Sequence, residues 1–360
     1  MNVLGDGLWN ALQMAWEVTW ALVLGFLLSA IVQAWVPRER MQGALGGDGL
    51  GTVALATGLG AASSSCSYAA VAIAKSMFQK GASLVSAMAF QFASTNLVFE
   101  LGIVMWIFLG WRFTLAELVG GLVLIVLLWG LLRLTVTRRA EEASREHAIA
   151  AETGHEHAHG RAWSAVAHYF VTDWKMLWKE IVGGFLISGF VALVPAGVFD
   201  ALFLKDAPAV PRLLVNAVVG PLVAVASFVC SVGNIPLGAV LWARGISFGG
   251  VLAFVFADLL IVPLVLIYRR YYGGRMTVRL VALMFAATVA AALVVDGIFS
   301  LAGLVPETRP DVDSITSRGI TWNYTTVLDI VFLVVAAVLV GMTRRRGERR
   351  VHRLEGGHAR

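Results

Sequence analysis

The chain has few charged residues and very few cysteines for its length. Of its 360 residues only 14% are charged, whereas 58% are hydrophobic, and the mean hydropathy is +0.78. This composition excludes an ordinary soluble domain, in which about 25% of residues are charged. The two cysteines are also too few for a disulfide framework. The sequence therefore predicts a polytopic membrane protein.

Motifs for nucleotide binding and hydrolysis are also missing. The chain contains no P-loop, no His-Glu-x-x-His and no Gly-x-Ser-x-Gly. We therefore expect no enzyme activity, no cofactor and no ATP-driven pumping by this chain alone. The histidines of Thr153-Gly-His-Glu-His-Ala-His-Gly160 (His155, His157 and His159) have metal-binding spacing, but such polar runs are commonly solvated, and no metal site is predicted.

Apolar runs long enough to cross a bilayer recur along the chain. About 20 helical residues cross the hydrocarbon core, which is about 30 Å thick. Continuous spans are expected at residues 8–36, 82–109, 113–134, 246–267 and 277–301, with another ending near Phe203.

The two cysteines occupy equivalent places in an internal duplication. Cys66-Ser67 and Cys230-Ser231 are 164 positions apart, and the same offset relates Gly81-Ala-Ser83 to Gly245-Ile-Ser247 without a gap. Self-similarity at a fixed offset indicates two structural repeats.

Each Cys-Ser pair interrupts an apolar segment whose arms are short. In the first, residues 43–60 and 68–79 flank the polar run at 63–67, and an arm of about 14 residues is only about 21 Å long. We expect a re-entrant hairpin there and a second at 211–243, with two short tilted spans as the alternative. Such irregular backbone is tolerated in a membrane only where protein or a watery cavity covers it.

Basic residues predict the orientation, because cytoplasmic loops are enriched in Lys and Arg. Most of the 28 are assigned to the inside, namely Arg38 and Arg40, Lys75 and Lys80, those at 133–179 and 269–279, and those of the tail from 344. The N-terminus is then outside and the C-terminus cytoplasmic. Lys80 falls inside but Arg244 outside, so the repeats are predicted to be inverted. Inverted repeats of secondary transporters bring discontinuous helices together at a midplane site.

The expected fold is an all-α polytopic membrane protein with two inverted-topology repeats, each with a broken-helix hairpin, plus one extra C-terminal span. The predicted division is a first transmembrane repeat at 1–136, a cytoplasmic His- and Arg-containing linker at 137–175, a second transmembrane repeat at 176–303, an external loop at 304–320, the final span at 321–343 and a basic cytoplasmic tail at 344–360.

The hairpin breaks supply candidate substrate ligands. A Cys-Ser pair that opens the second arm lies at a helix N-terminus, whose positive dipole end favours an anionic substrate or a thiolate. The alternative is that each cysteine is a small apolar residue that allows tight packing. The candidate substrate-binding residues are Cys66, Ser67, Cys230, Ser231 and Asn234.

Polar residues deep in the spans are candidates for coupling. Charged side chains at membrane depth usually face a cavity. Asp258 lies near the middle of the 246–267 span, and Asn96 and Glu100 are expected on one face of the 82–109 span. They could bind the proton or cation that drives transport, or form hydrogen-bonded contacts between helices.

The second hairpin resembles a known family. Ser227-Phe-Val-Cys-Ser-Val-Gly-Asn-Ile-Pro-Leu-Gly-Ala-Val-Leu-Trp242, with Ala253-Phe-Val-Phe-Ala-Asp258, is similar to the bacterial predicted permeases that include the ArsP-like organoarsenical efflux permeases. The resemblance covers most of the chain and includes the paired Cys-Ser pattern. It implies an inner-membrane permease and, for the characterised branch, secondary export of trivalent organoarsenicals. The first hairpin departs from the second by having Ala72 in place of Pro236.

The expected function is a secondary permease that moves a small solute across the bacterial inner membrane, bound between the two Cys-Ser hairpins. Trivalent organoarsenicals, or related soft or thiol-reactive species, suit two thiol ligands. The expected partners are a small-molecule or metalloid substrate and the lipid bilayer, without nucleic acid; homo-oligomer formation stays open. The alternatives are a membrane-embedded thiol- or sulfur-handling enzyme, and a sensor or scaffold acting through the His-rich linker.

Overall fold

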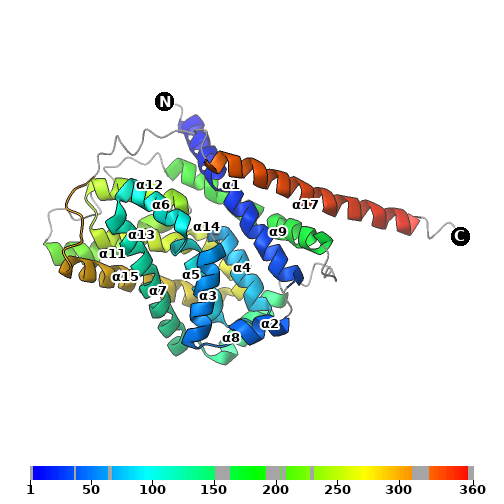
Figure 1. The fold of residues 1–360 in the computed structure, drawn as a ribbon, viewed down its shortest axis with the longest axis horizontal. Coiled ribbons are helices and arrows are strands. Elements are labelled where there is room, and N and C mark those ends of the chain that lie inside the picture. Colours follow the sequence, from blue (N-terminus) through cyan, green and yellow to red (C-terminus); the bar gives the residue numbers. More distant parts are fainter. Residues whose placement is uncertain are drawn as a thin grey trace.

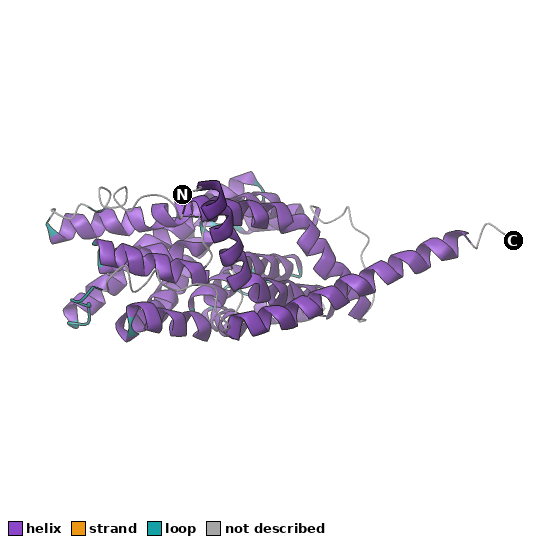
Figure 2. Cartoon of the chain, turned by 90° about the horizontal axis from the view of Figure 1, so that it is seen from above, coloured by secondary structure: helices purple, strands orange, loops and turns teal. Residues whose placement is uncertain are grey.

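The computed structural model describes residues 3–35, 38–63, 67–150, 163–191, 203, 208–227, 231–309 and 324–355. Every regular element within these ranges is a helix (Figures 1 and 2). Among the described residues, four helices are long and apolar enough to cross a membrane, or five if one bent pair counts as a single span. The prediction of an all-α polytopic membrane protein is confirmed.

The helices fall into two sets that follow one another along the chain. The first set is α1 (Val3–Trp35), α2 (Arg38–Leu45), α3 (Leu50–Ser63), α4 (Ser67–Gln79), α5 (Leu84–Asn96), α6 (Phe99–Leu109), α7 (Trp111–Thr135) and α8 (Arg138–Ala150). The second set is α9 (Trp163–Val191), α11 (Ala209–Ser227), α12 (Ser231–Arg244), α13 (Phe248–Phe256), the 3-10 turn η1 (Ala257–Leu259), α14 (Val262–Tyr272), α15 (Gly274–Leu301) and α17 (Tyr324–Glu355).

The two sets repeat their helix pairings. The first hairpin packs α3 and α4 against α5, and the second packs α11 and α12 against α13. Further along each set, α5 contacts α7 as α13 contacts α15, and α6 contacts α7 as α14 contacts α15. These pairings agree with the duplication in the sequence. The inverted membrane orientation of the two repeats stays a prediction.

Glycines let the first arm of each hairpin approach its neighbour closely. A Cβ atom on Gly60 of α3 would lie 2.4 Å from the carbonyl oxygen of Phe90, and one on Gly220 of α11 would lie 2.4 Å from that of Gly250. No side chain fits at such distances, so glycine is required for the packing of α3 on α5 and of α11 on α13. Close approach at small residues is typical of helix pairs in membranes.

The matching Gly-x-Ser segments form the same turn in both repeats. Gly81 has φ +104° and Gly245 has φ +111°, a conformation that residues with a side chain rarely adopt. Two residues later, Ser83 and Ser247 cap α5 and α13 by accepting the amide hydrogen of the third residue that follows. The turn therefore ends one helix and starts the next within a few residues.

The expectation of a continuous span at 82–109 is wrong. α5 ends at Asn96 and α6 begins at Phe99. The hydroxyl of Thr95 donates to the Phe92 carbonyl oxygen at 3.3 Å, and the side-chain amide of Asn96 donates to the same oxygen at 3.2 Å. Such local bonds compete with the backbone bonds that would continue the helix.

The expected continuous span at 246–267 is also broken, by η1 and a bend of 42° between Phe248–Leu259 and Val262–Tyr272. Proline has no N–H, so Pro263 cannot donate to the carbonyl of Leu259 four residues earlier. The Tyr268 hydroxyl donates to this carbonyl instead, at 3.1 Å. The second repeat thus breaks its helix at the position equivalent to the break between α5 and α6.

The final span packs outside this repeated unit. α17 lies against α1 and α9 and then continues away from the body of the molecule (Figures 1 and 2). Asp329 of α17 accepts a hydrogen bond from the backbone N–H of Trp20 in α1, at 2.7 Å. This bond fixes the C-terminal helix to the first one.

The region predicted as the linker is partly helical. α8 packs against α4 and α14, and α9 begins at Trp163, within the 137–175 segment. His155, His157 and His159 lie outside the described residues, so their role and the boundaries of the division stay predictions.

Lys75 is a buried cation of the first hairpin. It was counted with the inside basic residues, which stays a prediction, and it lies within α4 with 2% of its surface exposed. Its ammonium nitrogen is 5.0 Å from the centre of the Tyr271 ring. Because protein surrounds α4 on every side, a cation–π contact takes the place of the hydration that a loop lysine would have.

Replacing Gly60 or Gly220 by Ala is expected to lower the free energy of unfolding by about 1–3 kcal/mol, because the added Cβ forces packed helices apart. Denaturant unfolding in detergent measures this difference. Gly58 in α3 is the control, since a Cβ there meets nothing within 4 Å. Gly58→Ala should be neutral or stabilising by about 0.5–1 kcal/mol. Equal losses at Gly58 and Gly60 would contradict the close approach.

Candidate functional site

The N-terminal ends of α4 and α12 meet inside the protein. The Oγ atoms of Ser67 and Ser231, the serines of the two Cys-Ser pairs, are 3.1 Å apart and form a hydrogen bond. Both serines are buried. Cys66 and Cys230 lie outside the described residues. The structure thus joins the two hairpins at equivalent positions of the duplication.

Asp258 of η1 extends this contact. The Ser67 hydroxyl donates to its Oδ2 at 2.9 Å. A hydroxyl has one hydrogen to donate, so the bond between the serines must be donated by Ser231. The result is a chain of hydrogen bonds from Ser231 through Ser67 to Asp258, which joins both hairpin breaks to the break after α13. Asp258 is fully buried.

The second oxygen of the Asp258 carboxyl group is not part of this chain of hydrogen bonds. Oδ1 of Asp258 has no hydrogen-bond partner within the described residues. The hydroxyls of Thr95 and Ser231 face the same carboxyl group, but neither reaches hydrogen-bond geometry with Oδ1. Because an unsatisfied buried acceptor is costly, this oxygen is a candidate for binding a proton, a cation or a substrate group.

A second polar pair supports the cluster from the neighbouring helices. The Gln91 side-chain amide of α5 donates to the Tyr268 hydroxyl of α14, which itself donates to the Leu259 carbonyl beside Asp258. The break that carries Asp258 is therefore held by residues of both repeats.

Asn234 lies one turn after Ser231 on α12 and is fully buried. Neither its Oδ1 nor its Nδ2 has a hydrogen-bond partner within the described residues. An amide in this condition can both donate to and accept from a bound solute. Its assignment to substrate binding stays a prediction.

The expected pairing of Asn96 with Glu100 on one helix face is wrong. Asn96 is the last residue of α5, whereas Glu100 lies in the first turn of α6, so the break separates them. The Glu100 side chain lies outside the described part of the structure. Asn96 turns its amide nitrogen toward Phe92 and Thr95, and its Oδ1 has no partner among the described residues.

The sequence analysis missed Glu117 of α7. This residue is 1% exposed, and neither of its carboxyl oxygens has a hydrogen-bond partner in the described part of the chain. The signal that could have identified it is the one used for Asp258, an acid inside an otherwise apolar span.

Two arginines at the repeat offset hold the far ends of the second arms. Arg145 and Arg309 each donate hydrogen bonds to two backbone carbonyls there. Each guanidinium group also lies over an aromatic ring, with its carbon 4.4 Å from the ring centre for Arg145 and 3.9 Å for Arg309. The acceptors are Phe78 and Ala82 for Arg145, and Trp242 and Ile246 for Arg309; the rings are those of Phe78 and Trp242. Arginine thus satisfies the carbonyls that end α4 and α12. Sequence analysis did not pair these arginines.

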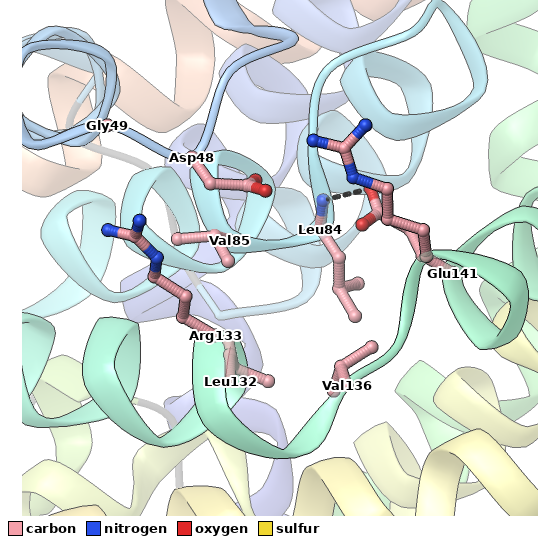
Figure 3. A pocket seen from close by; sticks show the side chains of 9 residues that line it. Asp48, Gly49, Leu84, Val85, Leu132, Arg133, Val136 and Glu141 are labelled. Atoms are coloured by element: carbon pink, nitrogen blue, oxygen red, sulfur yellow. Dashed lines mark hydrogen bonds between the residues drawn. The ribbon is translucent and has the colours of Figure 1, made fainter.

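A polar cavity lies beside the end of the first hairpin (Figure 3). Its volume is about 410 Å³, and Asp48, Arg133, Arg138 and Glu141 are its charged lining residues. The Leu84 N–H donates to Glu141 at 2.9 Å, as the dashed line in Figure 3 shows. Burial raises the pKa of Glu141, opposed by the Leu84 amide and by Arg145. None of the predicted site residues lines this cavity.

The helix pairings and the joined Cys-Ser hairpins can be compared with known proteins. The ArsP_1 predicted permease family matches residues 10–297, which is most of the chain. The chain belongs to this family. A protein of Mycobacterium tuberculosis (strain ATCC 25618 / H37Rv), named "Putative permease Rv2963", is 44% identical over 342 residues, covering 89% of this chain and 84% of its own. No solved structure matches the chain.

Membership of the family confirms the resemblance drawn from the second hairpin. Together with the apolar helices, it supports a multi-pass membrane protein that transports a small solute rather than an enzyme. The substrate, the site residues and the orientation of the termini stay predictions.

Ser67→Ala is expected to lower the free energy of unfolding by about 1–3 kcal/mol, because it leaves Asp258 without its hydroxyl donor. In an Asp258→Asn background the same change should cost less, since a neutral amide loses less than a carboxylate. A double-mutant cycle by unfolding in detergent measures the coupling, expected at about 0.5–3 kcal/mol.

Ser76→Ala is the control for this cycle. Ser76 is buried on the same helix as Ser67 but donates to the Ala72 carbonyl and not to Asp258. Its effect should add to that of Asp258→Asn without coupling. A cycle in which Ser67 and Ser76 behave alike would contradict the contact between Ser67 and Asp258.

Proposed function

We propose that this protein is a secondary permease of the bacterial inner membrane that binds a small solute between its two Cys-Ser hairpins. The observation that carries the proposal is the 3.1 Å contact between Ser67 and Ser231. It joins the N-terminal ends of the two broken helices, one from each repeat, which is where such transporters bind substrate.

The chemistry beside this contact suits a soft or anionic group. Consecutive Cα atoms are about 3.8 Å apart, so Cys66 and Cys230 are each one peptide unit from the joined serines. Thiolates are preferred by soft species, and the free amides of two helix N-termini favour negative charge. On this basis the substrate is a trivalent organoarsenical or a related thiol-reactive species, and its direction is efflux.

Alternating access follows if the two repeats are inverted. In that arrangement Arg145 would hold the end of α4 on the cytoplasmic side, and Arg309 the end of α12 on the outer side. Rocking one repeat against the other would loosen one of these arginine contacts while the other holds. The substrate site would then open to one side at a time.

Coupling is assigned to the buried carboxyl group of Asp258. It touches the substrate-binding serines through Ser67, so its charge and the geometry of the hairpin breaks change together. Protonation would remove the strongest acceptor of the Ser67 hydroxyl and so weaken the connection between the two hairpins. Proton uptake could in this way be linked to substrate release.

The double variant Cys66→Ala, Cys230→Ala is expected to lose resistance to methylated arsenite by at least an order of magnitude in a sensitive bacterial host, because both soft ligands are gone. Growth and cell-associated arsenic should be measured over inorganic and methylated arsenite, antimonite and copper. Uptake into inverted vesicles gives the rate directly. Undiminished resistance and uptake in the double variant would contradict substrate binding by the two thiols.

Deletion of residues 151–160 is the control, since it removes the His-rich segment while leaving both hairpins intact. A permease should keep resistance after this deletion. A sensor or scaffold acting through the histidines should lose resistance after this deletion. The thiol-enzyme alternative is tested separately: such an enzyme should form a product in proteoliposomes without solute flux.

Inverted repeats predict that the two arginine positions lie on opposite sides of the membrane. Glu146 and Glu307 are exposed neighbours of Arg145 and Arg309, and each can be changed to Cys in the Cys66→Ala, Cys230→Ala background. A membrane-impermeant maleimide on whole cells with a permeable outer membrane should label the Glu307→Cys variant. The Glu146→Cys variant should react only after the inner membrane is opened. Labelling of both from one side would rule out the inversion.

A further inference from the structure

We infer that Glu117 of α7 is a second proton-binding group that works with Asp258 in coupling, an assignment that rests on the proposed transport function. A secondary permease that accumulates solute against a gradient uses a coupling ion, and a buried acid without a hydrogen-bond partner among the described residues is a natural place for a proton. Three observations carry the inference: the isolation of the carboxyl group, its position against both helix breaks, and the nature of the unpartnered atoms around it.

The Glu117 carboxyl group is isolated from water and from donors. It is 1% exposed, and neither Oε1 nor Oε2 has a hydrogen-bond partner within the described residues. An ionised carboxylate would lose its hydration there without a compensating charge. The neutral acid avoids that penalty, so this conformation suits the protonated form.

The face of α7 that carries Glu117 packs against both broken helices. Gly120 and Gly121 follow it by three and four residues and share its face. A Cβ on Gly120 would lie 2.3 Å from the Phe256 ring, and one on Gly121 would lie 2.7 Å from the Leu97 side chain. Phe256 directly precedes η1, and Leu97 directly follows α5. Glu117 therefore lies where α7 crosses the two breaks.

Asp258 is the second residue after Phe256, against which Gly120 packs, so Glu117 and Asp258 lie in one buried region of the protein. Two carboxylates in one buried region repel each other, so at most one is ionised without a bound cation. Asp258 accepts a hydrogen bond from Ser67, whereas Glu117 has no donor among the described residues. The shared proton is therefore assigned to Glu117 in this conformation.

The unpartnered side-chain atoms of α5 and η1, and those of Glu117 itself, are all acceptor oxygens. They belong to three side chains of α5 and η1, namely Gln91 (Oε1), Asn96 (Oδ1) and Asp258 (Oδ1), and to both oxygens of Glu117. What this set lacks is hydrogen to donate. A proton that moves between Glu117 and Asp258 supplies a donor, whereas a bound anion would add another acceptor.

Infrared difference spectroscopy on the full chain in lipid tests the assignment without any substrate. Wild-type protein should show the C=O stretching band of a buried protonated carboxyl group at neutral pH, and E117Q should lack it. Glu146→Gln is the control, since that carboxyl group is exposed. If E117Q does not fold, labelling the wild-type protein with 13C-glutamate should shift the band. An unchanged E117Q spectrum, an unshifted band, or a band abolished by sodium ions at constant pH would overturn the inference.

Proteoliposomes separate this inference from the proposed function. With a substrate found in the resistance panel, a pH gradient should drive accumulation in the wild type. E117Q should accumulate at least ten-fold less substrate than the wild type, while it keeps substrate exchange at equal pH. Gradient-driven transport at the wild-type rate in E117Q would refute the role of Glu117. If the wild type moves no substrate at all, the proposed function fails instead, and the infrared band still decides whether Glu117 binds a proton.

Discussion

The hydrogen-bonded chain from Ser231 through Ser67 to Asp258 is the interaction on which the rest of the structure depends. Each of its members lies at a helix break, and an interrupted helix at membrane depth must have its polar groups covered by protein. Joining the breaks lets each cover part of the others. The hairpins, η1 and the surrounding helices are therefore arranged around one buried polar centre and not around separate ones.

Because the chain is duplicated, the same local packing features occur in both repeats. Gly60 and Gly220 allow the first arms to pack, Gly81 and Gly245 turn the chain, and Arg145 with Arg309 holds the ends of the second arms. The two repeats differ in their buried polar residues. The second repeat has Asp258 and Asn234, and α7 of the first has Glu117. A shared scaffold with unequal polar residues is consistent with the coupled transport proposed above.

In the proposed mechanism the helix breaks also connect substrate binding with movement. Polar residues end α5, and Pro263 lies in the first turn of α14 after the 42° bend, so both interruptions come from the local sequence. The proposed substrate ligands and the acidic groups of Asp258 and Glu117 lie at or beside these breaks. A change in the charge of a carboxyl group would therefore act directly on the points where the helices can change direction.

The sequence alone determined the membrane class, the duplication, both hairpin breaks and the family, because composition, a constant offset and the local motif around Cys230 are properties of residues close in the chain. It also singled out Ser67, Ser231 and Asp258. Only the tertiary structure decided that these three touch, that Lys75 is buried, that Arg145 and Arg309 are equivalent, and that Glu117 shares the face of α7 that packs against the breaks after α5 and α13. These features depend on contacts between helices far apart in sequence. Hydropathy places a residue along the membrane normal, but it does not say which neighbour the residue faces.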